Sequence, residues 1–541
     1  MKKLLREENI IEKRAVVCFF IITALLMSCV MRVAVISQSD YGEAAAKQSG
    51  YRISVCGIRG TIYDCNMLPV TNQKSRIMAA VSPTPEAIVA ISAELEGAEK
   101  ERVLGELKNG KPAVCEVKKE INAGGVICTT VYENTSSDMP AEHIIGYVNG
   151  ENHGVSGLQA AYDELLYSGS CVEAVFSSNG RGKLLYGVDP YFENDLAEVN
   201  SGVVTTLDIN IQNAVCNAAD KIERGAVVVA DSYTNEIKAM VSKPGFDATD
   251  VSKYLNSADS PLLNRALASY SVGSAFKPCV AAAAIENNLG NFTFECTGKT
   301  HIIDRDFRCH KRDGHGMMNL RTALAQSCNC FFYNFAIKLG AEPIYKTARN
   351  LSFDGNIKIA DNIETSSGIL PELQDISENA ALLANLSIGQ GKLMLSPVAM
   401  LNLYSAIASD GSYNLPCIVK GTLTDGSLKK YEGSKKTKVM SEKTAQLLRS
   451  YLASVVTEGT GTDAKPSSCT AAGKTATAQT GRFDENGREI NNGWFCGFFP
   501  AEKPKYTVIV MTEGKSEISA ASVFSAVADG INAYESGKKE G

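Results

Sequence analysis

The sequence has no excess of positive charge. Its 54 lysine and arginine residues stand against 60 aspartate and glutamate residues, and the formal net charge at pH 7 is −6. Proteins whose main partner is nucleic acid usually carry clustered basic residues, so this balance argues against that class. Internal repeats and long low-complexity segments are also missing. With 541 residues, of which 45% are hydrophobic and 21% charged, the composition indicates an ordinary globular protein of two or more domains.

Cysteine pairs of the Cys-x-x-Cys type are missing as well. The chain has 16 cysteines, of which Cys18 and Cys29 lie in an apolar N-terminal segment, but none belongs to a Cys-x-x-Cys pair. This absence excludes a zinc ribbon and a thioredoxin-like motif. Outside a membrane, an oxidising setting would favour disulfides, whereas free thiols would indicate an organism that lives without oxygen. The sequence is consistent with both.

A long apolar run stands near the N-terminus. Residues 1–14 are polar and basic, whereas residues 15–36 carry no charge except Arg32, which can reach toward the membrane surface. We therefore predict a cytoplasmic tail at 1–14, a single-pass transmembrane anchor at 15–36, and the rest of the chain on the outer face of the cell membrane. A cleaved signal peptide is the alternative, because residues 26–29 resemble a lipoprotein cleavage site.

One central stretch combines a hydroxyl with an amine. Residues 270–277 read Tyr-Ser-Val-Gly-Ser-Ala-Phe-Lys and are followed by a run of small apolar residues. In a helix, a spacing of three places Ser274 and Lys277 on the same face, one turn apart. A serine becomes a nucleophile when a base removes its proton, and a lysine whose pKa is lowered by burial can be that base.

Two later stretches complete a set of three motifs. Ser327 and Asn329 form a Ser-x-Asn motif, and residues 474–477 read Lys-Thr-Ala-Thr. The order Ser-x-x-Lys, Ser-x-Asn, Lys-Thr-x-Thr is the signature of penicillin-recognising serine acyltransferases. Over nearly its whole length, the chain resembles a class B (monofunctional) penicillin-binding protein.

The resemblance implies a role for each residue of the first two motifs. Ser274 would attack the carbonyl between two D-alanines of a peptidoglycan stem peptide and form an acyl-enzyme, with Lys277 as the base. Ser327 would relay a proton to the departing amine, and Asn329 would hold the amide of the substrate.

The third motif would bind the end of the substrate. By the same resemblance, Lys474 adds positive charge, and Thr475 and Thr477 supply hydroxyls for the terminal carboxylate. The backbone amides of Ser274 and Thr477 would form the oxyanion hole. Ala476 stands where the family usually has glycine. Its methyl group is expected to narrow the groove without abolishing activity, which leaves β-lactam affinity open.

The resemblance also implies the fold. We expect an α/β (α+β) penicillin-binding transpeptidase domain, similar to serine β-lactamases, at 201–534, preceded by the transmembrane helix and a strand-rich pedestal domain at 37–200, and followed by a disordered tail at 535–541. In the pedestal, the usual Asp-Arg-Asn of the family is Asp-Cys-Asn at 64–66, and its usual glutamate is Gln159. The region is too short to hold a glycosyltransferase as well, which argues against a bifunctional enzyme.

The implied function is that of a peptidoglycan D,D-transpeptidase, which cross-links stem peptides and is covalently inhibited by β-lactams. It requires no cofactor for catalysis, and the expected partner is a membrane-embedded polymerase that makes glycan strands. A D,D-carboxypeptidase and a β-lactam-binding scaffold or sensor are the alternatives. Intact motif residues argue against a scaffold, and the short cytoplasmic tail argues against a sensor. The sequence does not assign the chain to elongation, division or sporulation.

A further cluster lies between the first two motifs. Cys296, Cys309, His315 and Cys328 fall within 33 residues, and cysteine and histidine are the ligands of tetrahedral zinc sites. A structural zinc here would fix a loop to Cys328, beside the active site. The alternatives are a Cys309–Cys328 disulfide, which would make the site redox-sensitive, and incidental buried thiols with a surface histidine.

Overall fold

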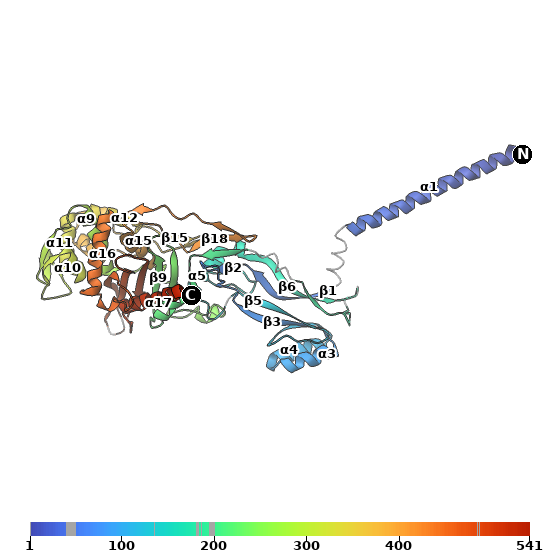
Figure 1. The fold of residues 1–541 in the computed structure, drawn as a ribbon, viewed down its shortest axis with the longest axis horizontal. Coiled ribbons are helices and arrows are strands. Elements are labelled where there is room, and N and C mark those ends of the chain that lie inside the picture. The colour runs from blue at the N-terminus through green and yellow to red at the C-terminus, as the bar shows by residue number, and fades with distance from the viewer. Residues whose placement is uncertain are drawn as a thin grey trace. The chain divides into compact units, whose positions relative to one another are not determined.

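The computed structural model describes residues 2–38, 50–134, 136–179, 183–185, 187–193, 201–483, 485, 487–514 and 516–540. By packing, the chain forms two compact units (Figure 1). The first comprises Met1–Gly57, Ser75–Val131 and Ser170–Leu196, and the second comprises Ile58–Lys74, Tyr132–Gly169 and Ala197–Gly541.

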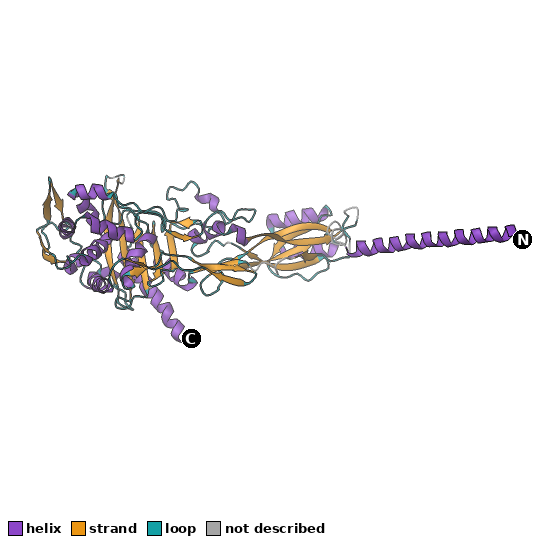
Figure 2. Cartoon of the chain, turned by 90° about the horizontal axis from the view of Figure 1, so that it is seen from above, coloured by secondary structure: helices purple, strands orange, loops and turns teal. Residues whose placement is uncertain are grey.

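Helix α1 (Lys2–Gln38) is the long helix at the N-terminus in Figure 2. Its segment Lys13–Ile36 is long and apolar enough to cross a membrane, by length and composition. The predicted anchor at 15–36 lies within this segment, and the predicted tail belongs to the same helix from Lys2 onward.

The first unit is rich in strands, as predicted for the pedestal. Its hydrophobic core joins Ala79 and Val81 of one strand to Ile91 and Leu107 of two helices. One sheet has the order β1-β6-β7 and the other the order β4-β3-β5. The elements are β1 (Gly50–Arg59), β3 (Lys74–Val81), β4 (Ala113–Val117), β5 (Val126–Glu133), β6 (Tyr167–Ser177), β7 (Tyr191–Glu193), α3 (Pro85–Glu94) and α4 (Gly97–Lys108).

The second unit is built on a five-stranded antiparallel sheet with the order β10-β9-β23-β22-β21. Every residue of β23 (Tyr506–Thr512) is buried, which suits the central strand of a sheet covered on both faces. The other strands are β9 (Gly225–Asp231), β10 (Ile237–Lys243), β21 (Ala472–Phe483) and β22 (Glu489–Phe499).

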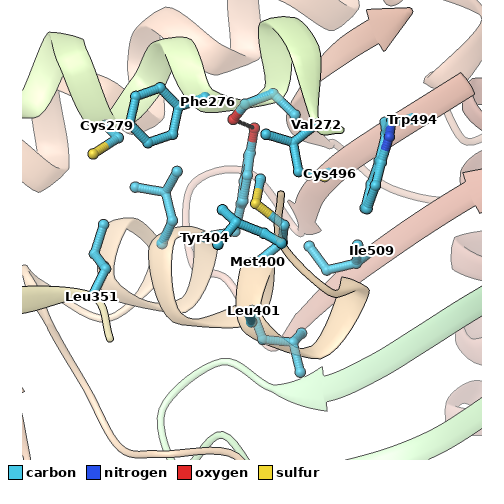
Figure 3. Packing of buried hydrophobic residues seen from close by; sticks show 14 of the residues in the cluster. Val272, Phe276, Cys279, Leu351, Met400, Leu401, Tyr404, Trp494, Cys496 and Ile509 are labelled. Carbon is cyan, nitrogen blue, oxygen red and sulfur yellow. Dashed lines mark hydrogen bonds between the residues drawn. The ribbon is translucent and has the colours of Figure 1, made fainter. Parts of the chain in front are cut away.

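Helices cover both faces of this sheet. On one face, α8 (Ile209–Ala218) and α17 (Ala520–Glu540) share a hydrophobic core with alternate residues of the strands. On the other face, α15 (Pro397–Ala408) packs on the sheet, and its Tyr404 points toward the turn that carries Phe276 (Figure 3). This turn is the 3₁₀ helix η3 (Gly273–Phe276), which leads into α9 (Lys277–Glu286).

Smaller elements complete the second unit. A side sheet has the order β19-β18-β8-β2. Its strands are β2 (Thr61–Tyr63), β8 (Gly202–Thr205), β18 (Val419–Thr424) and β19 (Ser427–Lys430). The helices are α5 (Glu142–Ile145), α6 (Gly157–Ala161), α7 (Asp163–Leu166), α10 (Leu320–Ala325), α11 (Asn329–Leu339), α12 (Ala341–Asn350), α13 (Leu373–Glu378), α14 (Ala380–Ser387), α16 (Glu442–Thr457) and the 3₁₀ helices η2 (Val251–Tyr254) and η4 (Thr462–Ala464). The short paired strands are β11 (Thr293–Cys296), β12 (Lys299–Ile302), β13 (Arg305–Arg308), β14 (Gly316–Asn319), β15 (Lys358–Ala360), β16 (Ile363–Glu364), β17 (Ser412–Tyr413) and β20 (Thr437–Lys438).

The division between the units differs from the predicted pedestal at 37–200. Residue 200 lies outside the described residues, but residues 58–74 and 132–169 pack with the second unit. The reason is long-range pairing, because β2 runs parallel to β8 and Ile62 is buried in the main hydrophobic core.

The predicted disordered tail at 535–541 is wrong as far as Glu540, because α17 continues to that residue. Side chains of the last turns hold the helix in place: Lys538 pairs with Asp208 at 3.5 Å, and Glu535 pairs with Lys505. Residue 541 lies outside the described residues.

Arg59 is buried in a polar network of the second unit. Its guanidinium pairs with Asp163 at 2.7 Å and donates to the side-chain oxygen of Gln159 at 2.7 Å. Asp64 instead accepts the backbone amides of Asn66 and Leu68 at 2.8 Å. The glutamine in place of the usual glutamate therefore still binds Arg59, as a neutral acceptor.

Candidate active site

The first motif lies on a tight turn that fixes the serine in front of strand β21. Gly273 has a positive φ of +55°, and a Cβ atom there would lie 3.1 Å from the carbonyl oxygen of Thr477. Its backbone amide donates to the carbonyl of Gly389 at 3.0 Å. Only glycine suits this combination of backbone angle and close approach. Ser274 follows in η3, and Lys277 begins α9 one turn later, as the spacing predicts.

Two aromatic side chains hold this turn by hydrogen bonds to its backbone carbonyls. The Tyr404 hydroxyl donates to the carbonyl of Ala275 at 3.0 Å, and the Trp494 indole donates to the carbonyl of Ser271 at 3.0 Å. Figure 3 shows both rings among the buried side chains of this core. The nucleophile is thus carried by backbone that is hydrogen-bonded on both sides of Ser274, which limits its movement.

Lys277 is fully buried and joins the first two motifs. Its Nζ donates to the carbonyl of Ser327 at 2.7 Å, to the Ser327 hydroxyl at 3.2 Å and to the Asn329 side-chain oxygen at 2.8 Å. No carboxylate is among these partners. Burial therefore dominates and lowers the pKa of Lys277 to about 7. A large share of this amine is neutral at neutral pH, and its lone pair can accept a proton.

The second motif lies in the connection between two helices. Ser327 follows α10 and has a positive φ of +53°, which is rare for a residue other than glycine. Asn329 is the first residue of α11. The unusual backbone of Ser327 places its carbonyl and its hydroxyl on the same amine of Lys277, and such local strain is typical of functional sites.

The third motif lies on β21, the edge strand of the main sheet. Lys474 is fully buried, and its Nζ donates to the carbonyl of Thr475 at 3.0 Å. Burial and the neighbouring charge of Lys277 lower the pKa of Lys474 well below its usual value. The hydroxyls of Thr460 and Thr475 lie 2.7 Å apart.

These residues surround one open cavity of about 620 Å³. Ser274, Ser327, Asn329, Thr475 and Thr477 all line it, whereas the two lysines lie buried beside it. The structure therefore brings together all seven residues that the three motifs predict. The cavity combines a nucleophile, a nearby amine and several hydrogen-bond donors, as acyl transfer requires.

Other lining residues belong to none of the motifs. Among them are His310, Thr460, Asp463, Asn491 and Ser516. Their sequence neighbourhoods give no signal of a site, because folding brings them in from separate segments: the loops after β13, α16 and β23, the 3₁₀ helix η4 and the start of β22. Ala476 also lines the cavity, and it lies opposite Trp494 in the pairing of β21 with β22.

The predicted metal ligands form a compact cluster. One ligand atom from each of Cys296, Cys309, His315 and Cys328 lies within 4.8 Å of all the others. His315 Nδ1 is 3.6 Å from the sulfur atoms of Cys296 and Cys309. The sulfur atoms of Cys309 and Cys328 are 3.9 Å apart, whereas a disulfide needs about 2 Å, so the two thiols are separate here.

Cys309 and His315 are in protonation states that suit a cation, whereas the contact with Cys309 and burial raise the pKa of the Cys328 thiol. Hydrogen bonds from the thiols of Cys328 and Cys330 lower the pKa of Cys309. Burial lowers the pKa of His315, which favours the neutral imidazole. A thiolate and a neutral imidazole are the forms that bind zinc.

Comparison with known proteins gives the family. Residues 225–529 match the penicillin binding protein transpeptidase domain. The stage V sporulation protein D of Bacillus subtilis is 30% identical over 428 residues, which cover 75% of this chain and 64% of that protein. The peptidoglycan D,D-transpeptidase MrdA of Acinetobacter baumannii is 27% identical over 451 residues, which cover 72% of this chain and 64% of that protein. The chain thus spans slightly less than two thirds of these relatives.

A solved structure shares the fold. Penicillin binding protein 3 from Mycobacterium tuberculosis, complexed with aztreonam, superposes with a TM-score of 0.64 and 24% identity, over 90% of this chain and 97% of that one. The matched domain covers more than half of the sequence and contains all three motifs. The chain therefore belongs to the penicillin-binding protein transpeptidase family, as a class B member.

Proposed function

We propose that the chain is a serine-type peptidoglycan D,D-transpeptidase that β-lactams inhibit covalently. The observation that carries this proposal is the amine of Lys277, which is buried, hydrogen-bonded to both residues of the second motif, and held one turn from Ser274. The relative named a D,D-transpeptidase and the structure complexed with aztreonam support both parts of the proposal.

The first half of the reaction forms an ester. The Ser274 oxygen attacks the carbonyl carbon of the bond between two D-alanines, and its proton passes to the neutral amine of Lys277. When the carbon–nitrogen bond breaks, a proton moves through the Ser327 hydroxyl to the departing amine of D-alanine. The peptide remains bound to Ser274 as an acyl-enzyme.

The second half transfers the peptide. The amine of another stem peptide attacks the ester carbonyl, and its proton returns through the same groups as the Ser274 oxygen leaves. The backbone amides of Ser274 and Thr477 stabilise the negative oxygen of both tetrahedral intermediates. The hydroxyls of Thr475 and Thr477 bind the terminal carboxylate of the donor, and Lys474 lies buried beside them. No cofactor takes part in these steps.

Product analysis tests this proposal against its alternatives. The full chain in detergent is incubated with glycan strands that carry stem pentapeptides, and the products are separated by mass. A transpeptidase releases D-alanine and yields cross-linked dimers. Release of D-alanine with tetrapeptides alone would show a carboxypeptidase, and no release would show a scaffold.

We further propose that α1 anchors the chain in the cell membrane and that the catalytic domain faces outward. The support is the apolar segment Lys13–Ile36, preceded by basic residues. A membrane-embedded glycan polymerase is the proposed partner, because the proposed reaction acts on glycan strands and such a polymerase makes them. Crosslinking in membranes should recover such a polymerase with the full chain. Recovery of none, together with full cross-linking activity of a chain that lacks residues 1–38, would contradict the proposal.

We also propose that Cys296, Cys309, His315 and Cys328 hold one structural zinc ion. Zinc would fix the hairpin that joins the first two motifs, and its removal would lower thermal stability. Chain purified under reducing conditions should contain about one zinc ion per molecule. Cys309→Ser should lose it, whereas Cys469→Ser, which changes a cysteine outside the cluster, should keep it. Absence of metal together with a Cys309–Cys328 bond found by mass spectrometry would favour the disulfide.

A further inference from the structure

The segment 297–315, which lies between β11 and β14, contributes His310 to the lining of the active-site cavity. Within it, β12 and β13 form a hairpin, and the residue pair that follows is Cys309 and His310. His310 is exposed, and it lines the same cavity as Ser274, Ser327 and Asn329. The proposed chemistry gives His310 no role.

The backbone of His310 is fixed on both sides. The amide of Cys309 donates to the carbonyl of Gly298 at 2.9 Å, and the amide of His315 donates to the carbonyl of Cys296 at 2.9 Å. Gly298 has a positive φ of +91°, and a Cβ atom there would lie 1.8 Å from a carbonyl oxygen of the same loop. The loop is therefore tightly packed on itself, and the backbone around His310 is held by hydrogen bonds within the loop.

The side chain of His310 also has neighbours that orient it. Its Nδ1 lies 3.9 Å from the Cys309 sulfur, and its ring centroid lies 5.0 Å from that of His315. Both neighbours belong to the proposed zinc cluster. The proposed zinc cluster is therefore in direct contact with His310, because Cys309 and His315 are the side chains against which the His310 ring packs.

The loop is attached to the helix that begins with Asn329. Asn334 of α11 donates to the Thr300 hydroxyl of β12 at 3.2 Å, and the rings of Phe307 and Tyr333 lie 5.2 Å apart. His310 and Asn329 therefore belong to one packed assembly, and both line the cavity. The third motif, on β21, is assigned to the terminal carboxylate.

We propose that His310 is a specificity-determining residue that hydrogen-bonds the acyl-donor stem peptide upstream of the reacting bond. An imidazole offers one donor and one acceptor, which matches the N–H and C=O of a peptide amide. The contact is remote from the reacting carbonyl, so it contributes only with ligands long enough to reach it. The inference rests on the proposed transpeptidase function.

Two penicillins that acylate the same serine test the proposal. One is 6-aminopenicillanic acid, which has no acyl side chain, and the other carries a side chain that copies the upstream end of a stem peptide. His310→Ala in the full chain should slow acylation by the peptide-like penicillin about tenfold, the usual effect of one lost hydrogen bond. Acylation by 6-aminopenicillanic acid should change by less than about twofold, because this ligand does not reach the residue.

The controls separate a local contact from damage to the loop. His301→Ala removes an exposed histidine of the same hairpin, which pairs with Asp306 at 3.0 Å outside the cavity, and it should leave both rates unchanged. His310→Asn keeps a donor and an acceptor and should recover part of the rate. Equal slowing with both penicillins, or no slowing with either, would overturn the proposal. If neither penicillin acylates the wild-type chain, the proposed function itself fails.

Discussion

At the scale of single residues, Lys277 shows how burial can prepare a base. Its amine has oxygen partners from Ser327 and Asn329, but none of its partners among the described residues is a carboxylate that would stabilise the positive charge. Removal from water therefore outweighs the hydrogen bonds and lowers the pKa of Lys277 to about 7. The same burial lowers the free energy of unfolding. Between about pH 7 and 10.5, the unfolded chain keeps the proton on Lys277 whereas the folded chain has lost it. This destabilisation is complete below pH 7 and disappears as the pH rises toward 10.5.

The state of Lys277 predicts the pH dependence of acylation. Only the neutral amine accepts the proton of Ser274, so the rate of penicillin acylation should rise with pH and level off above about 7. At pH 5 it should be roughly a hundredfold lower than at pH 8, because little amine is neutral there. Stopped-flow measurements of fluorescent penicillin binding give the profile. Lys277→Arg should be inactive throughout, since a guanidinium does not release its proton in this range; a flat profile in the wild type would exclude Lys277 as the base.

At the scale of elements, the turn before α9 depends on one glycine. A side chain at Gly273 would meet the backbone of β21 in a left-handed conformation. We expect Gly273→Ala to destabilise the protein by about 1–2 kcal/mol and to slow acylation, because relief of the strain moves Ser274 away from β21.

Gly290→Ala is the matched control for this substitution. Its Cβ atom would make an ordinary contact of 3.5 Å with Ile285, and its backbone is not left-handed. Chemical denaturation and acylation rates of both variants check the prediction. Unchanged acylation in a folded Gly273→Ala variant would contradict the assigned role of the turn.

The elements that sequence patterns predict best are those with local signals. Ser441 precedes leucines at helical spacing, a pattern that predicts a helix N-cap, and its hydroxyl accepts the amide of Thr444 at the start of α16. The apolar and β-branched residues of 471–477 predict a strand, which is present as part of β21 and continues to Phe483, paired with Glu489 of β22. The motifs likewise predict which residues meet in the cavity. His310 could not be predicted, because its place depends on how a loop without a motif folds back on α11.

At the scale of the whole molecule, packing divides the chain where the sequence does not. Residues 58–74 lie more than a hundred residues before Ala197, where the largest segment of the second unit begins. Nevertheless, β2 completes the side sheet of that unit, and Ile62 is buried in its core. No composition change marks these segments, so only the long-range pairing of β2 with β8 shows where they belong. All residues assigned to the reaction lie in this second unit.

The measurement that tests the central claim most directly is the identification of the residue that penicillin acylates. Membranes that contain the full chain are labelled with a fluorescent penicillin, digested, and the modified peptide is sequenced by mass spectrometry. The proposed mechanism predicts one adduct, on Ser274, and no labelling of Ser274→Ala. The control Ser269→Ala changes a nearby serine whose hydroxyl donates to the carbonyls of Ser366 and Ser367, and it should label normally. An adduct on any other residue, or persistent labelling of Ser274→Ala, would contradict the proposed mechanism.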